Sequence, residues 1–552
     1  MMIILLVILA AMSAVQPVSA GWIETLPDKT IIHVLVHTLP DPTDTSTANR
    51  ADVAAVRAFR KRFPEIFAER YRDKYIANPE KYGHHNWDHV EVELHQFSGI
   101  LVEGVEHDLL AIAGGTAPDV LYVNFRRSDN YIENGFLYPL DKPEDGYLTG
   151  MTKDQIDFRI HPKIWPVIRR IGPAGEKHVW AIPYGGALGK VLVFRKNLFD
   201  EKGIPYPTAE WTWDDLLETA KKLTDPKRGI FGLAFGRGKH ESWHWITFLW
   251  SAGGDVMVYN EDKDEWHCVF DSPEAAVALN YYIRLCTEEW TDSEGKIRHG
   301  YAHKDTYTSG YQKWQHGEIG MMFEYIDEKL FSRIDPELTD MVPVPLGPTG
   351  KRGAELNSRM MGLFSRIGHP AVRDAAWEYI RFYDSSEAMQ IKTQIMVEGG
   401  FGRFINPKYL RMFGYPEVIR LSPKGWSETF EIAIETGMPE PYGRNSNFAY
   451  DMMTFPIQKA EQMAMSGKLP KDPEQRLNVL RELLREGNTR ANEEMIGTIS
   501  PKERLKRDVS AVVVLISIAI IFVLVFRYVA QAFRPPQFNS IKHLSWGFRK
   551  FA

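Results

Sequence analysis

The stretch AIAGGTAPDVLYVNFRRSDNYIENGFLYPLD, residues 111–141, joins a glycine turn, a short apolar run and a segment rich in aromatic residues. Gly114 and Gly115 interrupt the preceding pattern, and Pro118-Asp119 leads into the apolar run at 120–123. An apolar run of this length, bounded by turn residues, predicts a buried β-strand. Polar side chains follow at once, beginning with Asn124.

The segments before this strand alternate between the two regular structures. Residues 31–37 are rich in β-branched side chains and residues 90–97 alternate in polarity, so both predict strands. The apolar spacing at 51–63 and 100–113 predicts helices. Strands that alternate with helices build a parallel sheet, and such sheets bind ligands beyond the carboxyl ends of their strands.

The same alternation begins again in the second part of the chain. We expect strands at 190–194 and 231–235, and helices at 213–223, 243–251 and 273–289, with Thr212 as the N-cap of the first helix. Residues 476–490 predict an amphipathic surface helix whose inward side chains are Leu477, Leu480 and Leu484. Since 552 residues are too many for one hydrophobic core, the sequence predicts two lobes.

Four stretches, in this order, resemble the extracellular solute-binding proteins of carbohydrate ABC transporters, the family-1 or maltose-binding type. Residues 111–141 are the first. The others are VWAIPYGGALGKVLVFRKNLFDEKGI at 179–204, WQHGEIGMMFEY at 314–325 and AAWEYIRFYDSSEAMQ at 375–390. The resemblance covers roughly residues 30 to 460.

The resemblance implies an α/β fold of the periplasmic-binding-protein type II, in which two lobes close over a ligand by a hinge motion. It implies three crossings between the lobes, near Pro183-Tyr184, Met321–Phe323 and Arg359–Met361. Lobe 1 would then comprise about residues 22–183 and 322–358, and lobe 2 about residues 184–321 and 359–500.

A sugar site needs aromatic rings against the C–H faces and polar groups for the hydroxyls, because a buried hydroxyl without a partner costs about 1–3 kcal/mol. The resemblance places such residues in the cleft. The candidates are Asn124, Phe125, Arg126, Tyr184, Trp243, Trp250, Glu324, Tyr325, Glu355, Asn357 and Arg403.

Several of these residues have a purely structural alternative. Trp245 and Phe248 fit a helix core better than a ligand contact, and Asp119 fits the turn before its strand. Arg126 and Arg127 either form a solvated edge or contact an acidic sugar.

Other classes of protein are disfavoured. A net charge of −6 argues against a nucleic-acid binder. Gly238-Lys239 lacks the further residues of a P-loop, and His84, His85 and His89 fit a surface loop better than a metal site. No catalytic motif is present, so we predict a binding protein without cofactor or metal. Whether Cys268 and Cys286 pair is left open.

Both ends of the chain carry apolar segments. Residues 1–20 predict a signal peptide, with an uncleaved anchor as the alternative. The 18 residues from 509 to 526 carry no charge and predict a transmembrane helix at 509–529, followed by a basic cytoplasmic tail at 530–552. That helix is either an anchor alone or the start of a fused or truncated permease.

Together these features predict a membrane-anchored, monomeric substrate-binding subunit of an ABC importer. It would capture sugar or oligosaccharide outside the cytoplasmic membrane and deliver it to the permease, without a nucleic-acid partner. An anchored carbohydrate-active enzyme and a sugar-sensing subunit are the alternatives.

Overall fold

The computed structural model describes residues 21–98, 114–260, 265–326 and 337–496, a few residues between these ranges, and some residues between 509 and 527. Residues up to Ile496 form one compact unit, and those from Gly497 onward form a second. The predicted signal peptide, the cytoplasmic tail and most of the helix expected at 100–113 lie outside the described residues, as does part of the expected membrane span.

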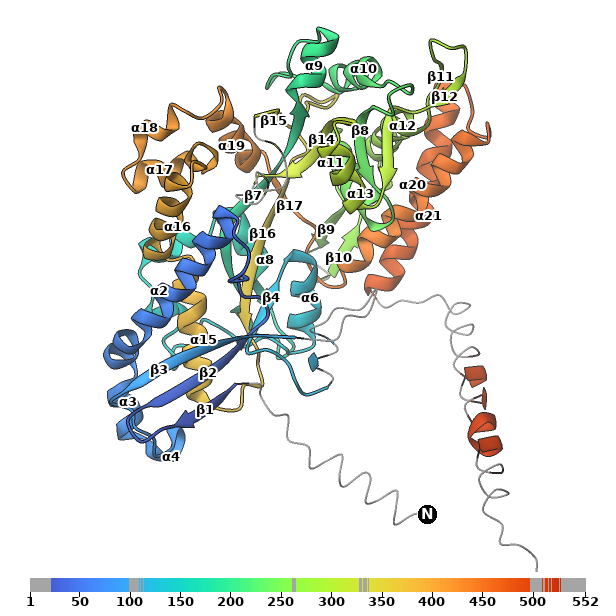
Figure 1. Ribbon diagram of the computed structural model, residues 1–552. Coiled ribbons are helices and arrows are strands. Elements are labelled where there is room, and N and C mark those ends of the chain that lie inside the picture. The colour runs from blue at the N-terminus through green and yellow to red at the C-terminus, as the bar shows by residue number, and fades with distance from the viewer. Residues whose placement is uncertain are drawn as a thin grey trace, which may run out of the picture. The chain divides into compact units, whose positions relative to one another are not determined.

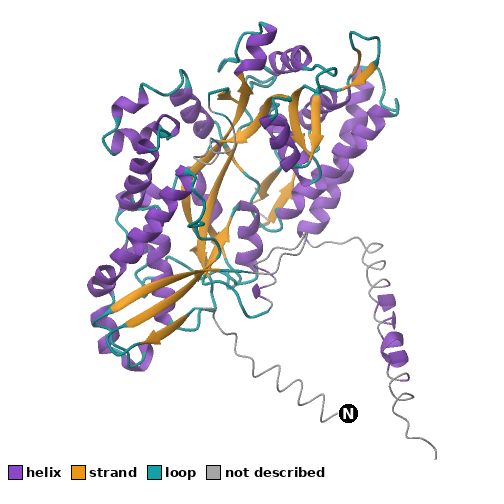
Figure 2. Ribbon diagram, viewed as in Figure 1, coloured by secondary structure: helices purple, strands orange, loops and turns teal. Residues whose placement is uncertain are grey.

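The first lobe is a sheet flanked by helices, as the alternation predicts (Figures 1 and 2). Strand β2 pairs in parallel with β3 and, at its end, with β4, whereas β1 runs antiparallel to β2 and β16 antiparallel to β4. The elements of this lobe are β1 (Trp22–Thr25), β2 (Thr30–Val36), α2 (Thr47–Arg70), α3 (Arg72–Ala77), α4 (Pro79–Tyr82), β3 (Val90–Gln96), β4 (Val120–Val123), α6 (Phe125–Glu133), α7 (Lys153–Arg159), α8 (Trp165–Ile168), β5 (Arg169–Ile171), β6 (Lys177–Val179), α15 (Pro370–Tyr383) and α16 (Ser386–Glu398).

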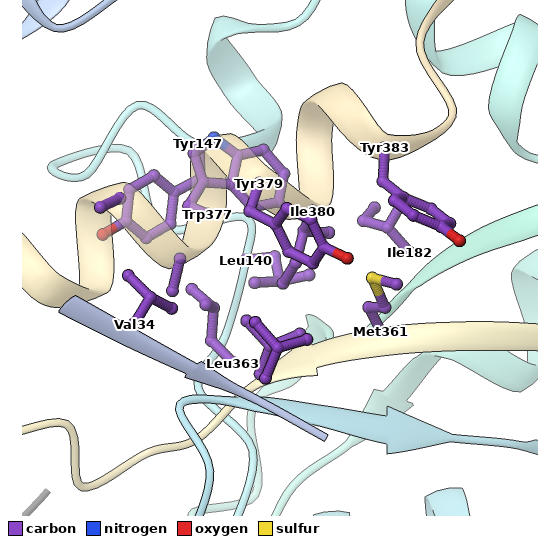
Figure 3. Packing of buried hydrophobic residues seen from close by; sticks show 14 of the residues in the cluster. Val34, Leu140, Tyr147, Ile182, Met361, Leu363, Trp377, Tyr379, Ile380 and Tyr383 are labelled. Carbon is purple, nitrogen blue, oxygen red and sulfur yellow. The ribbon is translucent and has the colours of Figure 1, made fainter. Parts of the chain in front are cut away.

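The core of the first lobe lies between this sheet and α15 (Figure 3). Trp377 of α15 stacks on Tyr147, with 5.1 Å between ring centroids, and both side chains are fully buried with Val34 and Leu363 in the same cluster. Asp119 lies at the edge of this core, where its carboxylate accepts the Leu35 N–H at 2.8 Å. The residue therefore holds the turn before β4, as we predicted.

The second lobe continues the same sheet and has a separate core. Strand β14 pairs in parallel with β8 and antiparallel with β7, and β13 pairs in parallel with β8. The elements of this part are β7 (Ile182–Arg195), α9 (Lys196–Lys202), α10 (Trp213–Leu223), β8 (Phe231–Gly236), α11 (Lys239–Ser251), β9 (Met257–Asn260), β10 (Glu265–Cys268), α12 (Pro273–Thr287), β11 (Glu289–Thr291), β12 (Ile297–His299), β13 (Ala302–Asp305), α13 (Tyr307–Gln315), β14 (Ile319–Tyr325), β15 (Thr339–Pro343), α20 (Asn447–Met465) and α21 (Pro473–Ile496).

Two long strands connect the lobes. β7 pairs with β16 (Glu355–Leu363) through residues 182–189 and with β14 and β15 through residues 190–195. The same strand contributes Ile182 to the first core and Leu192 to the second. The chain thus enters the second lobe along β7 and returns along β16, which agrees with the crossings expected near 183–184 and 359–361.

The crossing expected at Met321–Phe323 is wrong. Both residues belong to the second core, and β14 pairs along its length with strands of the second lobe. The expected division changes with it. Residues of β14 and β15 join the second lobe, whereas α15 belongs to the first.

The chain passes between the lobes a third time after α16. Phe404, in the short 3-10 helix at Gly402–Phe404, packs with Val191 and Val193 of β7, whereas its neighbour Ile405 packs with Ala48 of α2. The segment then continues through α17 (Pro407–Met412), α18 (Pro416–Ile419), α19 (Trp426–Glu435) and β17 (Met438–Pro439). Strand β17 pairs with β16, which brings the chain back to the connecting strands.

Among the described residues, the helices predicted from periodicity are present, most of them with shifted ends. Helix α2 continues through Pro64, and α11 begins four residues earlier than expected, at Lys239. In α21, Leu480 and Leu484 are fully buried and Leu477 is partly buried against the same core, as we predicted. Cys268 and Cys286 are both free thiols.

Thr212 caps α10, as we predicted. Its hydroxyl accepts the Asp215 N–H, and the Asp215 carboxylate accepts the Thr212 N–H in return. We expect Thr212→Ala to lower the free energy of unfolding by about 0.5–2 kcal/mol, because one helix N–H loses its partner. Denaturant unfolding of the full chain measures this loss, and Thr208→Ala in the preceding loop is the control.

Within the described part of the chain, no helix has both the length and the apolar character that a membrane crossing requires.

Candidate functional site

A buried ion pair joins the two connecting strands. Lys190 of β7 and Glu355 of β16 are both fully buried, with 2.7 Å between Nζ and Oε2. The ammonium also donates to the Trp243 carbonyl at 3.0 Å and to the Thr247 hydroxyl at 3.3 Å, so all three of its protons have acceptors. Burial lowers the pKa of Lys190, although the nearby Glu355 carboxylate opposes this.

Aromatic residues extend this pair. The Tyr325 hydroxyl, at the end of β14, donates to Glu355 Oε1 at 2.6 Å and accepts the Trp243 indole N–H at 3.0 Å. The Trp243 ring of α11 lies 3.7 Å from the Lys190 ammonium, which is a cation–π contact. The ring is 8% exposed, so most of it is buried against these polar groups.

The network continues to the first lobe through an amide and a second ion pair. Asn357 of β16 donates to the Tyr325 hydroxyl at 3.2 Å and to Glu440 Oε2 at 2.7 Å. Arg126, near the start of α6, lies with Nε 2.8 Å from Glu440 Oε1. Its guanidinium also covers the Tyr450 ring of α20, at 4.9 Å from the centroid. Side chains from both lobes therefore meet at the connecting strands.

Burial governs the charge of Glu440. It raises the pKa of Glu440 to about 7, against the opposing effect of the Arg126 guanidinium, while the neighbouring Glu355 carboxylate raises it further. The Glu440 carboxylate in turn raises the pKa of Arg126, which stays charged. Glu440 is fully buried, whereas the Arg126 side chain is 36% exposed. The network is therefore buried at Glu440 and has a solvent-facing edge at Arg126.

Three further aromatic residues contact one another. Tyr442, two residues after Glu440, meets Trp266 of β10 edge to face at 5.1 Å, and Trp266 meets Tyr259 of β9 at 5.3 Å. Tyr442 packs against the first core and Trp266 against the second, so the pair bridges the lobes. All three rings are at least partly exposed and can offer their faces to a ligand.

Comparison with known protein families identifies the family of this chain. Residues 103–390, just over half of the chain, match the family described as bacterial extracellular solute-binding protein. The chain belongs to this family. Members of the family and the similar solved structures are substrate-binding proteins, so this solute-binding protein is not an enzyme, as we predicted.

Solved structures share the fold at low sequence identity. An ABC substrate-binding protein from Listeria monocytogenes in complex with cycloalternan is 18% identical, with a TM-score of 0.52, over 84% of this chain and 98% of that chain. A solute-binding protein from Thermotoga lettingae bound to alpha-D-tagatose is 17% identical, with a TM-score of 0.54, over 83% and 99%. Maltose-bound MalE3 from T. maritima is 19% identical, with a TM-score of 0.52, over 82% and 99%.

A curated relative, a binding protein of Brucella abortus, is 21% identical over 275 residues. The match covers 49% of this solute-binding protein and 59% of the relative, so the chain spans less than two thirds of that relative's length.

Five of the predicted site residues of this solute-binding protein meet in one hydrogen-bonded network. They are Arg126, Trp243, Tyr325, Glu355 and Asn357. Three others stand on or next to the elements that carry it. Asn124 directly precedes α6, Glu324 is buried on β14, and Tyr184 of β7 packs edge to face on Tyr383 at 5.6 Å.

Three predicted site residues have structural roles instead. Phe125 is fully buried in the first core, and Trp250 is buried in the second, where its indole N–H donates to Asp255 at 3.0 Å. Arg403 lies after α16 and pairs with Glu337. Trp245 and Phe248 are buried core residues, as the structural alternative predicts.

Sequence reasoning did not find Lys190, Glu440 and Tyr450. Lys190 is the charge in the otherwise apolar run KVLVF, and a lysine inside a buried strand is a signal of a buried partner. Glu440 stands between two prolines in a loop, where the sequence shows no periodicity to indicate burial.

Proposed function

We propose that this chain binds a sugar or oligosaccharide as the substrate-binding subunit of an ABC importer and presents it to a permease. The observation that supports this best is the network from Lys190 to Arg126 between the two lobes. It contains carboxylate, amide and guanidinium groups for hydroxyls, and Tyr442, two residues after Glu440, joins Trp266 in offering partly exposed rings for C–H faces. Closure of the lobes about β7 and β16 would bring these groups around one ligand.

The ligands of the similar structures agree with this proposal. Three of these structures are bound to cycloalternan, alpha-D-tagatose and maltose. Another, UgpB from Mycobacterium tuberculosis, is in complex with glycerophosphocholine, at 15% identity and a TM-score of 0.51. The fold alone therefore leaves the ligand class open, and the polar side chains of the network support our proposal of a sugar.

The charges in the network favour an uncharged sugar. Lys190 pairs with Glu355 and Arg126 pairs with Glu440, so each of these cations already has a carboxylate. An acidic sugar would have to displace one of these carboxylates, and breaking a buried pair costs about 3–5 kcal/mol. We therefore favour a neutral saccharide over the acidic one that Arg126 first suggested.

The proposal includes a membrane tether at residues 509–529. The uncharged run of 18 residues at 509–526 is long enough to cross a bilayer, and the described side chains from Val512 to Val514 and from Ile520 to Val525 are more than half exposed. The family description places its members outside the cell. A tether would hold the binding unit near its permease and raise its effective concentration there.

A saccharide panel tests the function. The purified full chain in detergent is titrated with neutral and acidic mono-, di- and oligosaccharides and with glycerophosphocholine. A ligand at about 100 times its Kd stabilises the folded state by about 2.7 kcal/mol, so we expect a raised Tm and a change in tryptophan fluorescence for a neutral saccharide. A response to glycerophosphocholine alone, or to no member, contradicts the proposal. Copurification with a permease rather than a sensor tests delivery.

Trp266→Ala is expected to weaken saccharide binding about 3- to 10-fold, because an aromatic contact contributes about 0.5–1.5 kcal/mol beyond its buried area. Isothermal titration of the panel's best ligand measures the loss. Trp290→Ala is the matched control, because the Trp290 ring also contacts a tyrosine ring, that of Tyr301, but from the β11–β12 hairpin. Equal losses for both variants would place Trp266 outside the site.

A further inference from the structure

The first connecting strand contains a local break. Gly185 and Gly186, in the middle of β7, both adopt the left-handed conformation, with φ of 72° and 71°. Opposite them, the pairing of β16 with β7 shifts register between Asn357 and Arg359. The Ser358 hydroxyl donates to the Gly186 carbonyl at 3.1 Å, which places the two irregularities side by side. Glycine tolerates such backbone at low cost, so the break is a natural place for rotation.

A buried carboxylate holds the chain at the first of these glycines. Asp384, the C-cap of α15, is 3% exposed and accepts the Gly185 N–H. Its other oxygen accepts the Lys392 ammonium at 2.8 Å, and Lys392 also contacts Asp52 of α2 at 3.1 Å. Helices α2, α15 and α16 thus fix this peptide to the first lobe.

A buried guanidinium, that of Arg159, holds the carbonyl of Pro183, two residues before Gly185. Arg159, at the end of α7, is 6% exposed and donates twice to the Pro183 carbonyl, at 3.2 Å and 2.7 Å. It also donates to the carbonyls of Ile380 and Arg381 at the end of α15, at 3.2 Å and 3.0 Å. Residues 183–185 are therefore held to the first lobe by two buried charged groups, up to the first glycine of the break.

A cavity of about 380 Å³ lies next to the break. Gly185, Gly186 and Ala187 line it together with groups from both lobes, among them Lys392 of α16 and Ile434 of α19. Beyond it along β7 and β16 stand Lys190 and Glu355 of the candidate site. Arg159 and Asp384 line this cavity as well, so the groups that hold the strand and the glycines at which it breaks border the same free space.

We propose that Asp384 and Arg159 are positioning residues that fix where lobe rotation begins, at Gly185–Gly186. The inference rests on the proposed function insofar as the rotation closes the lobes on a ligand. Neither residue belongs to the candidate site. Each residue sets the angle between the two lobes in the absence of ligand, and with it how the groups on β7 face Arg126 on α6. That angle sets the fraction of molecules that are ready to bind.

Interlobe distances test this without any ligand. Spin labels are attached at Glu80→Cys in α4 and Lys222→Cys in α10, both exposed, in a full chain whose two native cysteines are replaced by alanine. We expect Asp384→Asn to broaden or shift the distance distribution measured by pulsed electron resonance. A distribution that superimposes on that of the parent chain overturns the proposal.

Asp374→Asn is the matched control. Asp374 is a buried carboxylate of the same helix, 3% exposed, but it accepts from Tyr75 within the first lobe. We expect it to lower Tm while leaving the distance distribution unchanged. Equal distributions for the two variants would reduce Asp384 to a structural residue. If Asp384→Asn does not fold, Lys392→Met, at a partly exposed position, removes the same support.

Ligand binding gives a second readout. With a saccharide from the panel, Asp384→Asn is expected to change Kd at least about fivefold, the lower end of typical coupling between separate sites, and Asp374→Asn to leave it unchanged. Because the distances are measured without ligand, failure of every saccharide to bind would contradict the proposed function and leave the hinge test intact.

Discussion

Replacing Lys190 by methionine is expected to lower the free energy of unfolding by about 3–5 kcal/mol, because it leaves a buried carboxylate without its cation. Glu355 is fully buried, and Lys190 lies 2.7 Å from it. The methionine is similar in length and apolar, so lost packing contributes little. Urea unfolding of the full chain, followed by circular dichroism, measures the change as a lower midpoint at constant slope.

The double variant Lys190→Met/Glu355→Gln separates charge from packing. Since apolar or neutral replacements of a whole buried pair are often nearly neutral, we expect it to recover most of the lost stability. Lys153→Met is the surface control, because Lys153 pairs with Asp157 in full contact with solvent, and its midpoint should not move. A midpoint for Lys190→Met equal to that of Lys153→Met would show that the pair is not buried in solution.

The elements were predictable where their pattern is local. The alternation at 90–97 and the capped helix at 213–223 both encode their own structure, and β3 and α10 reproduce them within one residue. The path of the chain between the lobes was not predictable in the same way. The apolar run of β14 resembles that of β7, and only the choice of partner strands shows that β14 stays within one lobe.

The site residues were likewise predictable only where the sequence signal is local. Asn124 directly follows β4, and Phe125 and Arg126 begin α6, where Phe125 is buried and Arg126 is partly exposed, so the apolar and polar residue types already separate them. Arg403 has no such local clue, because its partner Glu337 stands 66 positions away. Glu440 was missed for the same reason, since its partners Arg126 and Asn357 come from distant elements.

Replacing Arg126 by alanine is expected to weaken saccharide binding about 30- to 5,000-fold, because truncating one partner of a buried charge pair in a binding site costs about 2–5 kcal/mol. Two effects act together. The ligand loses the guanidinium at the solvent-facing edge, and Glu440 loses the cation that lowers its pKa. The Glu440 carboxyl is then protonated to a larger extent at neutral pH, and donates where it had accepted.

Arg373→Ala is the matched control, because Arg373 is also partly buried beside a carboxylate, with its Nη2 3.3 Å from Asp145, but within the first lobe. We expect it to lower stability and leave Kd unchanged. A double-mutant cycle of Arg126→Ala with Glu440→Gln, read by isothermal titration, apportions the loss. If Glu440→Gln restores binding in the Arg126→Ala background, the arginine acts through Glu440. If it does not, the guanidinium contacts the sugar itself. A Kd unchanged in Arg126→Ala would remove this network from the ligand site.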